Sequence, residues 1–296
     1  MPTFVAPSPN RHRAGVGHAC PLGHGVRCCL KVYVGFSFRR FTSDLRDACV
    51  EGHVNSTPPF NSVNRYLANP ALTAILKEFV TVRSLPLKAV EADFAVDATG
   101  FPTSRFVRWY NAKYGRKAHS RNWFKWHLVC GVKTKVITAL DISGCTVHDS
   151  CFFDPLVRRT AKHFEVSEIA ADKAYLGRRN METVEALGGT PYISFKTNTV
   201  EPKGESIWAK MYHLFMYNRE AFMFHYHKRS NAESAFSMIK RKLGDAVRSK
   251  SEVGQVNEVL AKCLYHNVCV PIRATHELGV QPTFGAESGV EPKLFI

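Results

Sequence analysis

The chain has 296 residues, of which 45% are hydrophobic and 22% charged, and it carries a formal net charge of +15. These proportions exclude a disordered or fibrous protein, and the lack of any run of about 18 apolar residues excludes a transmembrane helix. The excess of positive charge indicates a polyanionic partner, with nucleic acid as the first candidate.

Residues 1–59 contain scattered Gly, Pro, His and Arg without a sustained period, so we expect an irregular leader that is loosely structured or disordered. This segment lacks the continuous apolar core of a secretory signal. The nine cysteines of the chain are odd in number and irregularly spaced, which is typical of reduced intracellular thiols. The cluster of His18, Cys20, His24, Cys28 and Cys29 matches no standard zinc spacing, so we expect no metal site there.

Residues 60–90 are predicted to form a short helical region, in which Asn69 caps a helix that starts at Pro70. The pattern is compatible with DNA binding and equally with packing against the main domain.

The texture changes after residue 91. Alternating residues predict strands over 93–100, 124–132 and 135–143, and the basic turn from Lys133 to Lys135 predicts a hairpin. A helix capped near Asp149, a strand over 166–175, a helix over 177–189 and a strand over 190–196 follow. This order predicts a mixed α/β fold, in which an antiparallel meander of three strands is continued by parallel strands and flanked by helices.

The last helix of this order is predicted to span residues 226–244. Its apolar stripe suits packing against the sheet, and it consists of Ala232, Ala235, Phe236, Ile239 and Leu243. A neighbouring face carries one carboxylate, Glu233, among basic side chains. On a helical wheel Tyr226, Arg229 and Lys240 share that face with Glu233.

Asp97 and Asp172 end two predicted strands, and with Glu233 they could converge at one edge of the sheet. Three close carboxylates repel one another unless a cation binds them, and oxygen ligands of this kind suit Mg²⁺. Asp93 has the same parity as Asp97, so strand alternation alone does not choose between them. For Asp141, Asp149 and Asp154 we predict structural roles as caps.

Three stretches, "AVDATGF", "ADKAY" and "YHKRSNAESAFSMIK", resemble the three blocks of insertion-sequence DDE transposases with an RNase H-like catalytic core. The last block is similar to the Tyr-Arg-Glu-Lys signature of that group through Tyr226, Arg229, Glu233 and Lys240. The resemblance extends from about Asp93 to about Val270. It implies an RNase H-like catalytic domain over residues 91–270 with an insertion at about 200–224, followed by a C-terminal tail over 271–296.

The resemblance also implies roles for single residues. Asp97, Asp172 and Glu233 would be the catalytic residues and would bind the metal, expected as two Mg²⁺ ions with Mn²⁺ as a substitute. The residues expected to contact DNA are Tyr226, Arg229, Lys240, Lys228, Arg241 and Lys242.

The function implied is a transposase that cleaves DNA at the ends of an insertion sequence and joins them to target DNA. Its partners would be double-stranded DNA and a second copy of the chain on paired ends, in a prokaryotic cytoplasm and associated with the nucleoid. Two alternatives stay open: an inactive DNA-binding descendant of a transposase, and a metal-dependent nuclease that performs no strand transfer.

Two aromatic segments add candidates for nucleic-acid contact. The segment over residues 105–126 interleaves basic and aromatic side chains, so a DNA groove and a solvated hairpin are equally compatible with it. The insertion contains the aromatic residues Trp208, Tyr212, Phe215, Tyr217 and Phe222. We expect most of them to belong to the core. For His119, His127 and His148 we expect structural roles.

Overall fold

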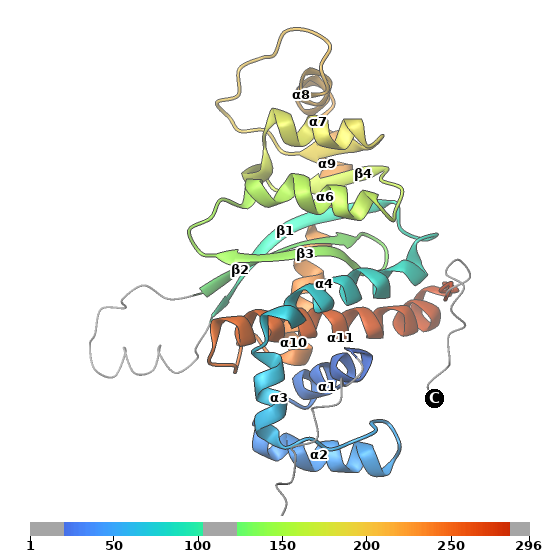
Figure 1. Cartoon of the computed structure of the whole chain (residues 1–296). Coiled ribbons are helices and arrows are strands. Elements are labelled where there is room, and N and C mark those ends of the chain that lie inside the picture. The colour runs from blue at the N-terminus through green and yellow to red at the C-terminus, as the bar shows by residue number, and fades with distance from the viewer. Residues whose placement is uncertain (1–20, 103–122, 285–296) are drawn as a thin grey trace, which may run out of the picture.

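A five-stranded mixed sheet forms the centre of the computed structural model, which describes residues 21–102 and 123–284 (Figure 1). The strands are β1 (Asp93–Pro102), β2 (Trp123–Gly131), β3 (Ile137–Gly144), β4 (Glu168–Ala171) and β5 (Thr190–Ile193), in the order β3-β2-β1-β4-β5. β1, β2 and β3 are antiparallel, whereas β4 pairs in parallel with both β1 and β5. The predicted mixed α/β sheet is confirmed, and its arrangement is RNase H-like.

Helices cover both faces of the sheet, because the strands of the meander alternate between two apolar cores. On one face α6 (Phe153–Ala161) and α7 (Arg178–Ala186) pack over Phe94 and Val96 of β1. On the other face α10 (Ser230–Leu243) and α11 (Glu252–Leu278) pack over Ala95 and Phe101. Figure 1 shows these two layers of helices above and below the sheet. Within the described ranges, no helix is both long enough and apolar enough to cross a membrane.

The N-terminal region is more regular than expected. We expected an irregular leader up to residue 59, but α1 (Pro21–Val34) and α2 (Phe38–Val50) lie within it. α1 buries Cys28 and Val32 in the core that α11 shares with the sheet, and α2 buries Phe41 and Leu45 in a smaller core. These apolar positions have helical spacing, but the Gly, His and Arg residues that precede them in each helix obscure the period. Residues 1–20 lie outside the described part of the chain.

The predicted helical region over 60–90 consists of α3 (Phe60–Leu67) and α4 (Pro70–Ser84). The Asn69 side chain accepts a hydrogen bond from the Ala71 amide at 3.0 Å, so the predicted cap is confirmed. α4 lies along α11, where Asn267 donates to the carbonyl oxygens of Val80 and Ile137. This region therefore packs against the main domain.

The end of the main domain also differs from expectation. We expected a tail from residue 271, but α11 continues through Pro271 to Leu278 and ends at Gly279, which has the left-handed φ of 64° that favours glycine. Val270 and Ala274 are buried against Leu87 and Val136, and this packing holds the last turns of α11 in place.

Candidate functional site

Asp97 and Asp172 lie where the parallel pairing of β1 and β4 ends, so Asp97 is in the middle of β1, rather than at a strand end as predicted, and Asp172 directly follows β4. The last residues that pair between β1 and β4 are Val96 and Ala171, and the two aspartates come directly after them. Asp97 has the parity of Ala95, which faces α10, and Asp172 has the parity of Ala170. Both carboxylates therefore belong to the face of the sheet that α10 covers.

α10 places Glu233 over the same edge. Its apolar stripe is buried as predicted, with Ala232, Ala235, Phe236 and Ile239 against the sheet. The Phe236 ring packs edge-on against the Trp126 ring of β2, with 4.9 Å between the ring centroids. Glu233 lies in the first turn of the helix, where a carboxylate interacts favourably with the helix dipole, and the basic residues gather in the last turn.

A cleft of about 630 Å³ opens between the middle of β1 and α10. Asp97 and Glu233 line it together with Lys240 and Arg241. Thr99 also lines the cleft, and the Lys240 Nζ donates to its hydroxyl at 2.7 Å. Sequence reasoning missed Thr99, although its position two residues after Asp97 places it on the same face of the strand.

The electrostatics of Asp97 are unusual for a carboxylate in this protein. Burial raises its pKa to about 6, an effect opposed by the hydrogen bond from the Ala98 amide at 2.8 Å and by the charge of Arg229. The negative charges of Glu233 and Asp172 raise the pKa further. The other two predicted site acids are therefore close enough to influence the charge of Asp97.

Asp97 and Asp172 differ from the other acids of the sheet in their partners. Among the described residues, no Lys, Arg or His lies within ion-pairing distance of either one. Asp172 accepts hydrogen bonds from the Lys173 amide at 2.7 Å and from the Tyr226 hydroxyl at 3.4 Å. Two neighbouring carboxylates without a cation form a donor set that suits a hard metal ion.

The three competing aspartates are paired instead. Lys77 binds Asp141 and Lys125 binds Asp149, at 2.7 and 2.9 Å. Asp154 accepts from Arg158 and Thr183. The predicted capping roles are therefore wrong: the residue that precedes α6 is Phe152, and the short 3₁₀ turn over Asp149–Phe152 has His148 at its cap.

Asp97, Asp172 and Glu233 are not arranged to bind one metal ion together in this structure. Within residues 21–102 and 123–284, no three His, Cys, Asp or Glu side chains lie close enough together to share one ion. The Glu233 carboxylate is held by the Arg229 guanidinium, with Nη1 to Oε1 at 2.7 Å. The side chains of Asp97 and Asp172 suit a divalent ion in kind, and Glu233 would have to leave Arg229 to join them.

The comparison with known families agrees with this geometry. The family of the transposase DDE domain matches residues 89–268, which is more than half of the chain and includes β1, β4 and α10. The chain belongs to this transposase family. No solved structure matches the chain at a significant level. DNA binding, transposase chemistry and the use of divalent metal ions are general properties of DDE transposases.

The residues that we expected at the DNA interface occupy different places. Tyr226 is the last residue of α9 (Arg219–Tyr226), and Arg229 lies in a 3₁₀ turn over His227–Arg229. The predicted helix from 226 is therefore two helices joined by a tight turn. Tyr226, Arg229 and Lys240 still lie near the acids, and Arg241 lines the cleft.

Lys228 and Lys242 do not point into the cleft. The Lys228 Nζ lies 2.7 Å from both Asp93 and Glu168. The Lys242 Nζ lies 5.2 Å from the centre of the Tyr265 ring and 3.7 Å from the Cys269 sulfur, so it faces α11.

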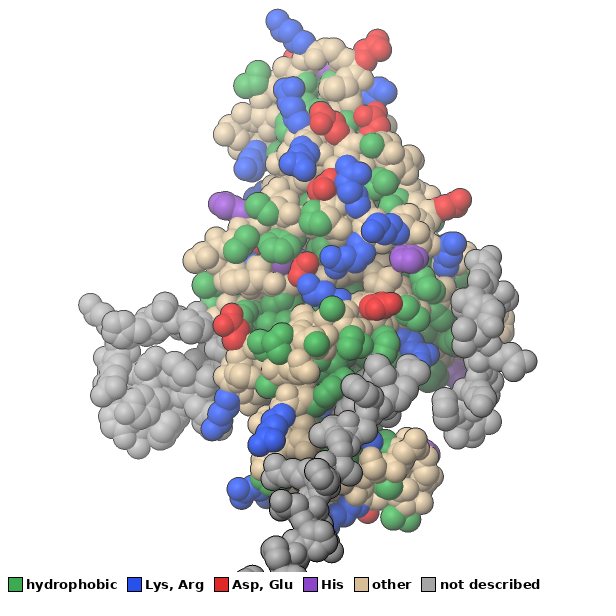
Figure 2. Space-filling view, viewed as in Figure 1, with side chains coloured by type: hydrophobic (Ala, Val, Ile, Leu, Met, Phe, Trp, Pro, Cys, Tyr) green, Lys and Arg blue, Asp and Glu red, His purple; other side chains and the backbone are tan. Residues whose placement is uncertain are grey.

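The aromatic side chains that we considered for nucleic-acid contact are mostly structural. In α8 (Ile207–Tyr217) and α9, Tyr212, Phe215 and Phe222 are buried, whereas Tyr217 is 78% exposed. His127 is buried and hydrogen-bonded to Ser143. The basic and aromatic segment between β1 and β2, which includes His119, falls mainly on residues 103–122, outside the described residues. Over the face seen in Figure 2, Lys and Arg side chains are spread widely rather than gathered in one patch.

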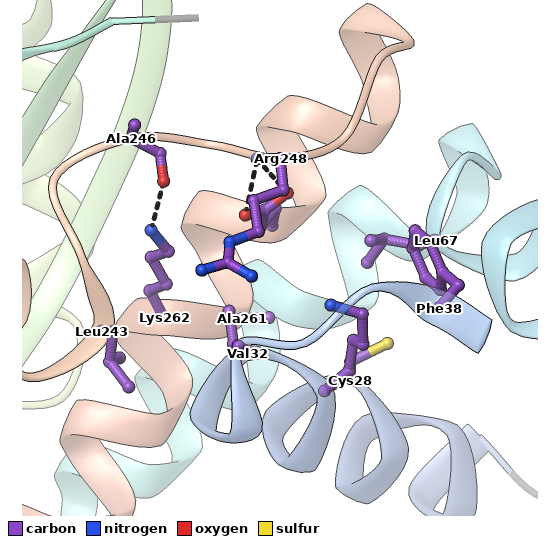
Figure 3. A pocket seen from close by; sticks show the side chains of 12 residues that line it. Cys28, Val32, Phe38, Leu67, Leu243, Ala246, Arg248, Ala261 and Lys262 are labelled. Atoms are coloured by element: carbon purple, nitrogen blue, oxygen red, sulfur yellow. Dashed lines mark hydrogen bonds between the residues drawn. The ribbon is translucent and has the colours of Figure 1, made fainter. Parts of the chain in front are cut away.

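Two buried charged residues of α11, Lys262 and Glu258, hold the loop after α10 in place (Figure 3). The Lys262 Nζ donates to the carbonyl oxygens of Gly244 and Ala246, both at 2.9 Å. The Glu258 carboxylate accepts from the amides of Arg248 and Ser249. Burial lowers the pKa of Lys262 to about 8. Because Gly244 and Asp245 line the cleft, these contacts set the position of its outer wall.

Proposed function

We propose that this chain is an active transposase that cleaves DNA at the ends of an insertion sequence and transfers the freed strand to target DNA. The observation that carries the proposal is the pair of carboxylates at the end of the β1–β4 pairing, Asp97 and Asp172, that have no cation of their own among the described residues. Every other acid of the sheet discussed above has a cationic partner.

In this proposal Asp97, Asp172 and Glu233 are the catalytic, metal-binding residues. Bound Mg²⁺ or Mn²⁺, as one or two ions, would supply Lewis-acid activation of the attacking oxygen and stabilisation of the leaving one. The raised pKa of Asp97 reflects a carboxylate whose charge lacks compensation, so it gains most from a nearby cation. Glu233 reaches the site from the first turn of α10 and is exposed, so its side chain is free to change rotamer.

DNA would lie along the cleft. Arg229, Lys240 and Arg241 would bind phosphate oxygens there, and Tyr226 would stack or hydrogen-bond beside Asp172. In this assignment Tyr226, Arg229, Glu233 and Lys240 form the Tyr-Arg-Glu-Lys signature. Coordinated processing of two ends requires two copies of the chain, so we include a homodimer on paired ends in the proposal.

The domain layout is part of the proposal. We propose one catalytic unit that starts near residue 91, carries the helical insertion of α8 and α9, and extends to the end of α11 at Leu278. The helices α1 to α4 support it from the α11 side.

The decisive experiment compares the wild type, Glu233→Gln and Glu277→Gln on a labelled duplex that carries the terminal DNA of the element. Glu277 is a matched control, because it is also an exposed glutamate paired with an arginine one helical turn away, at 2.8 Å. We expect Mn²⁺-dependent nicking and joining to a plasmid by the wild type and by Glu277→Gln, and neither activity in Glu233→Gln.

Other outcomes identify the alternatives. Tight DNA binding without cleavage by any of the three proteins would indicate the inactive descendant. Cleavage without joining, when pre-cleaved ends and target plasmid are both supplied, would indicate a nuclease.

A further inference from the structure

Lys228 bridges one step of the ladder between β1 and β4. Its Nζ lies 2.7 Å from the Asp93 Oδ2 and 2.7 Å from the Glu168 Oε2. Asp93 and Glu168 are direct partners in the parallel register. Each of them lies four residues before a proposed catalytic aspartate, Asp93 before Asp97 and Glu168 before Asp172, so both pairs of acids point to the same face of the sheet.

The backbone of Lys228 belongs to the 3₁₀ turn over His227–Arg229, which leads into α10. The Asn231 side chain donates to the Lys228 carbonyl oxygen at 2.7 Å, and the Ser230 hydroxyl donates to the His227 carbonyl oxygen at 2.9 Å. These bonds fix the backbone of the turn. The next residue, Arg229, holds Glu233. The ion pairs of Lys228 with β1 and β4 therefore fix the start of α10, the helix that contains Glu233.

A second contact supports the same junction. His225 lies 2.9 Å from the Glu168 carboxylate, and its ring stacks on Tyr192 of β5 at 4.5 Å. The end of α9 is thus tied to β4 and β5 while Lys228 ties the following turn to β1 and β4.

The charges around Lys228 argue against a phosphate contact. One ammonium faces two carboxylates, so the group of three carries a net negative charge and would repel a phosphate. Burial lowers the pKa of Lys228, but the hydrogen bonds to Asp93 and Glu168 outweigh this effect and the pKa is raised overall, which keeps the lysine charged. Its side chain is 22% exposed, with little surface left for DNA.

We infer that Lys228 is a positioning residue of the transposase, which fixes α10 on β1 and β4 so that Glu233 can reach the metal held by Asp97 and Asp172. This inference rests on the proposed function, and it replaces the DNA-binding role that the sequence predicted for Lys228. In metal sites, residues that orient the ligands commonly change metal affinity by about 10- to 100-fold when they are replaced.

The test uses the full chain and three variants, Lys228→Met, Lys228→Arg and Lys77→Met. Lys77 is the matched control, because it forms a similarly half-buried pair with Asp141, at 2.7 Å, on the distant strand β3. Binding of Mn²⁺ is measured from the electron paramagnetic resonance signal of the free ion, and duplex affinity is measured in EDTA at several salt concentrations. We expect Lys228→Met to bind Mn²⁺ about tenfold more weakly, with Lys228→Arg and Lys77→Met close to the wild type.

The salt dependence separates positioning from phosphate binding. A lost phosphate contact lowers the slope of log affinity against log salt by about 1, whereas we expect the slope of Lys228→Met to stay unchanged. Unchanged Mn²⁺ binding together with a lower slope would overturn the inference. If Lys228→Met does not fold, the triple variant Asp93→Asn, Glu168→Gln, Lys228→Met removes the unpaired charges, and it too should bind Mn²⁺ weakly.

Asp97→Asn distinguishes failure of this inference from failure of the proposed function. If Asp97→Asn abolishes Mn²⁺ binding and Lys228→Met does not weaken it, the inference alone is wrong. If Asp97→Asn binds Mn²⁺ as the wild type does, the proposed metal site is wrong and the inference falls with it.

Discussion

The Arg229 guanidinium lies 2.7 Å from the carboxylate of Glu233, a residue four positions later in the chain that lines the cleft. In the protein without metal or DNA, Arg229 thus forms an ion pair with the carboxylate that we propose as the third metal ligand. An exposed pair of this kind stabilises a protein by less than about 1 kcal/mol, so it can be broken readily.

Because we propose that Arg229 binds a DNA phosphate once Glu233 has joined the metal site, we expect Arg229→Ala to strongly reduce DNA cleavage while it changes the free energy of unfolding by less than about 1 kcal/mol. Urea unfolding and single-turnover cleavage of the element end measure the two effects. Arg273→Ala breaks the equivalent pair with Glu277 on α11 and should leave cleavage unchanged. Equal loss of cleavage in both variants would contradict a specific role for Arg229.

The raised pKa of Asp97 predicts a dependence of stability on pH in the metal-free protein. Because its pKa is about 6 in the folded state and ordinarily 3.8, the folded state binds this proton more tightly. The charged carboxylate therefore destabilises the fold above pH 6, and this penalty disappears as the pH falls from 6 towards 3.8.

In EDTA, Asp97→Asn should accordingly be more stable than the wild type by about 1–2 kcal/mol at pH 7.5, and the two should be equal near pH 4. Urea unfolding at both pH values checks this. Added Mn²⁺ should stabilise only the wild type at pH 7.5. A stability difference that does not change with pH would show that Asp97 is not destabilised by its charge.

Lys240 and Lys242 should differ in their effect on DNA binding. The Lys240 ammonium lies in the cleft on Thr99, whereas that of Lys242 faces Tyr265 on α11. We expect Lys240→Met to lower the salt slope of duplex affinity by about 1 and Lys242→Met to leave it unchanged. Fluorescence anisotropy at four salt concentrations resolves the two variants, and a loss in Lys242→Met alone would place the DNA on the α11 side.

Gly131 at the end of β2 should tolerate no side chain. A Cβ atom there would overlap the buried Glu91 carboxylate, which accepts hydrogen bonds from the Lys133 amide and from Thr134. We expect Gly131→Ala to destabilise the protein by about 1–3 kcal/mol, measured by urea unfolding. Gly144→Ala, at the end of β3 where a Cβ meets nothing, is the control and should be close to neutral.

The strands could be predicted from the sequence because their side chains alternate, and the same alternation put Asp97 and Thr99 on one face. It did not separate Asp97 from Asp93, which has equal parity. The difference between them is a partner, Lys228, that lies 135 residues away along the chain. A periodicity carries no information about such long-range pairs.

The local sequence pattern also failed to predict two elements, a turn and a helix. The 3₁₀ turn at His227–Arg229 interrupts a stretch whose residues are compatible with one helix, and it is held by tertiary contacts of Lys228. α1 was missed because the apolar positions that it buries have their partners on α11. In both cases the structure depends on contacts with distant parts of the chain.

The core shared by the sheet and the N-terminal helices has a consequence for cooperativity. Leu72, Leu76 and Val80 of α4, with Cys28 and Val32 of α1, lie in the same apolar cluster as Ala95 and Leu128 of the sheet. A fragment that begins at residue 89, where the family match starts, would expose the apolar side of α11 to water. We therefore expect the unit that unfolds cooperatively to be longer than the stretch that defines the family and to reach back at least to α1.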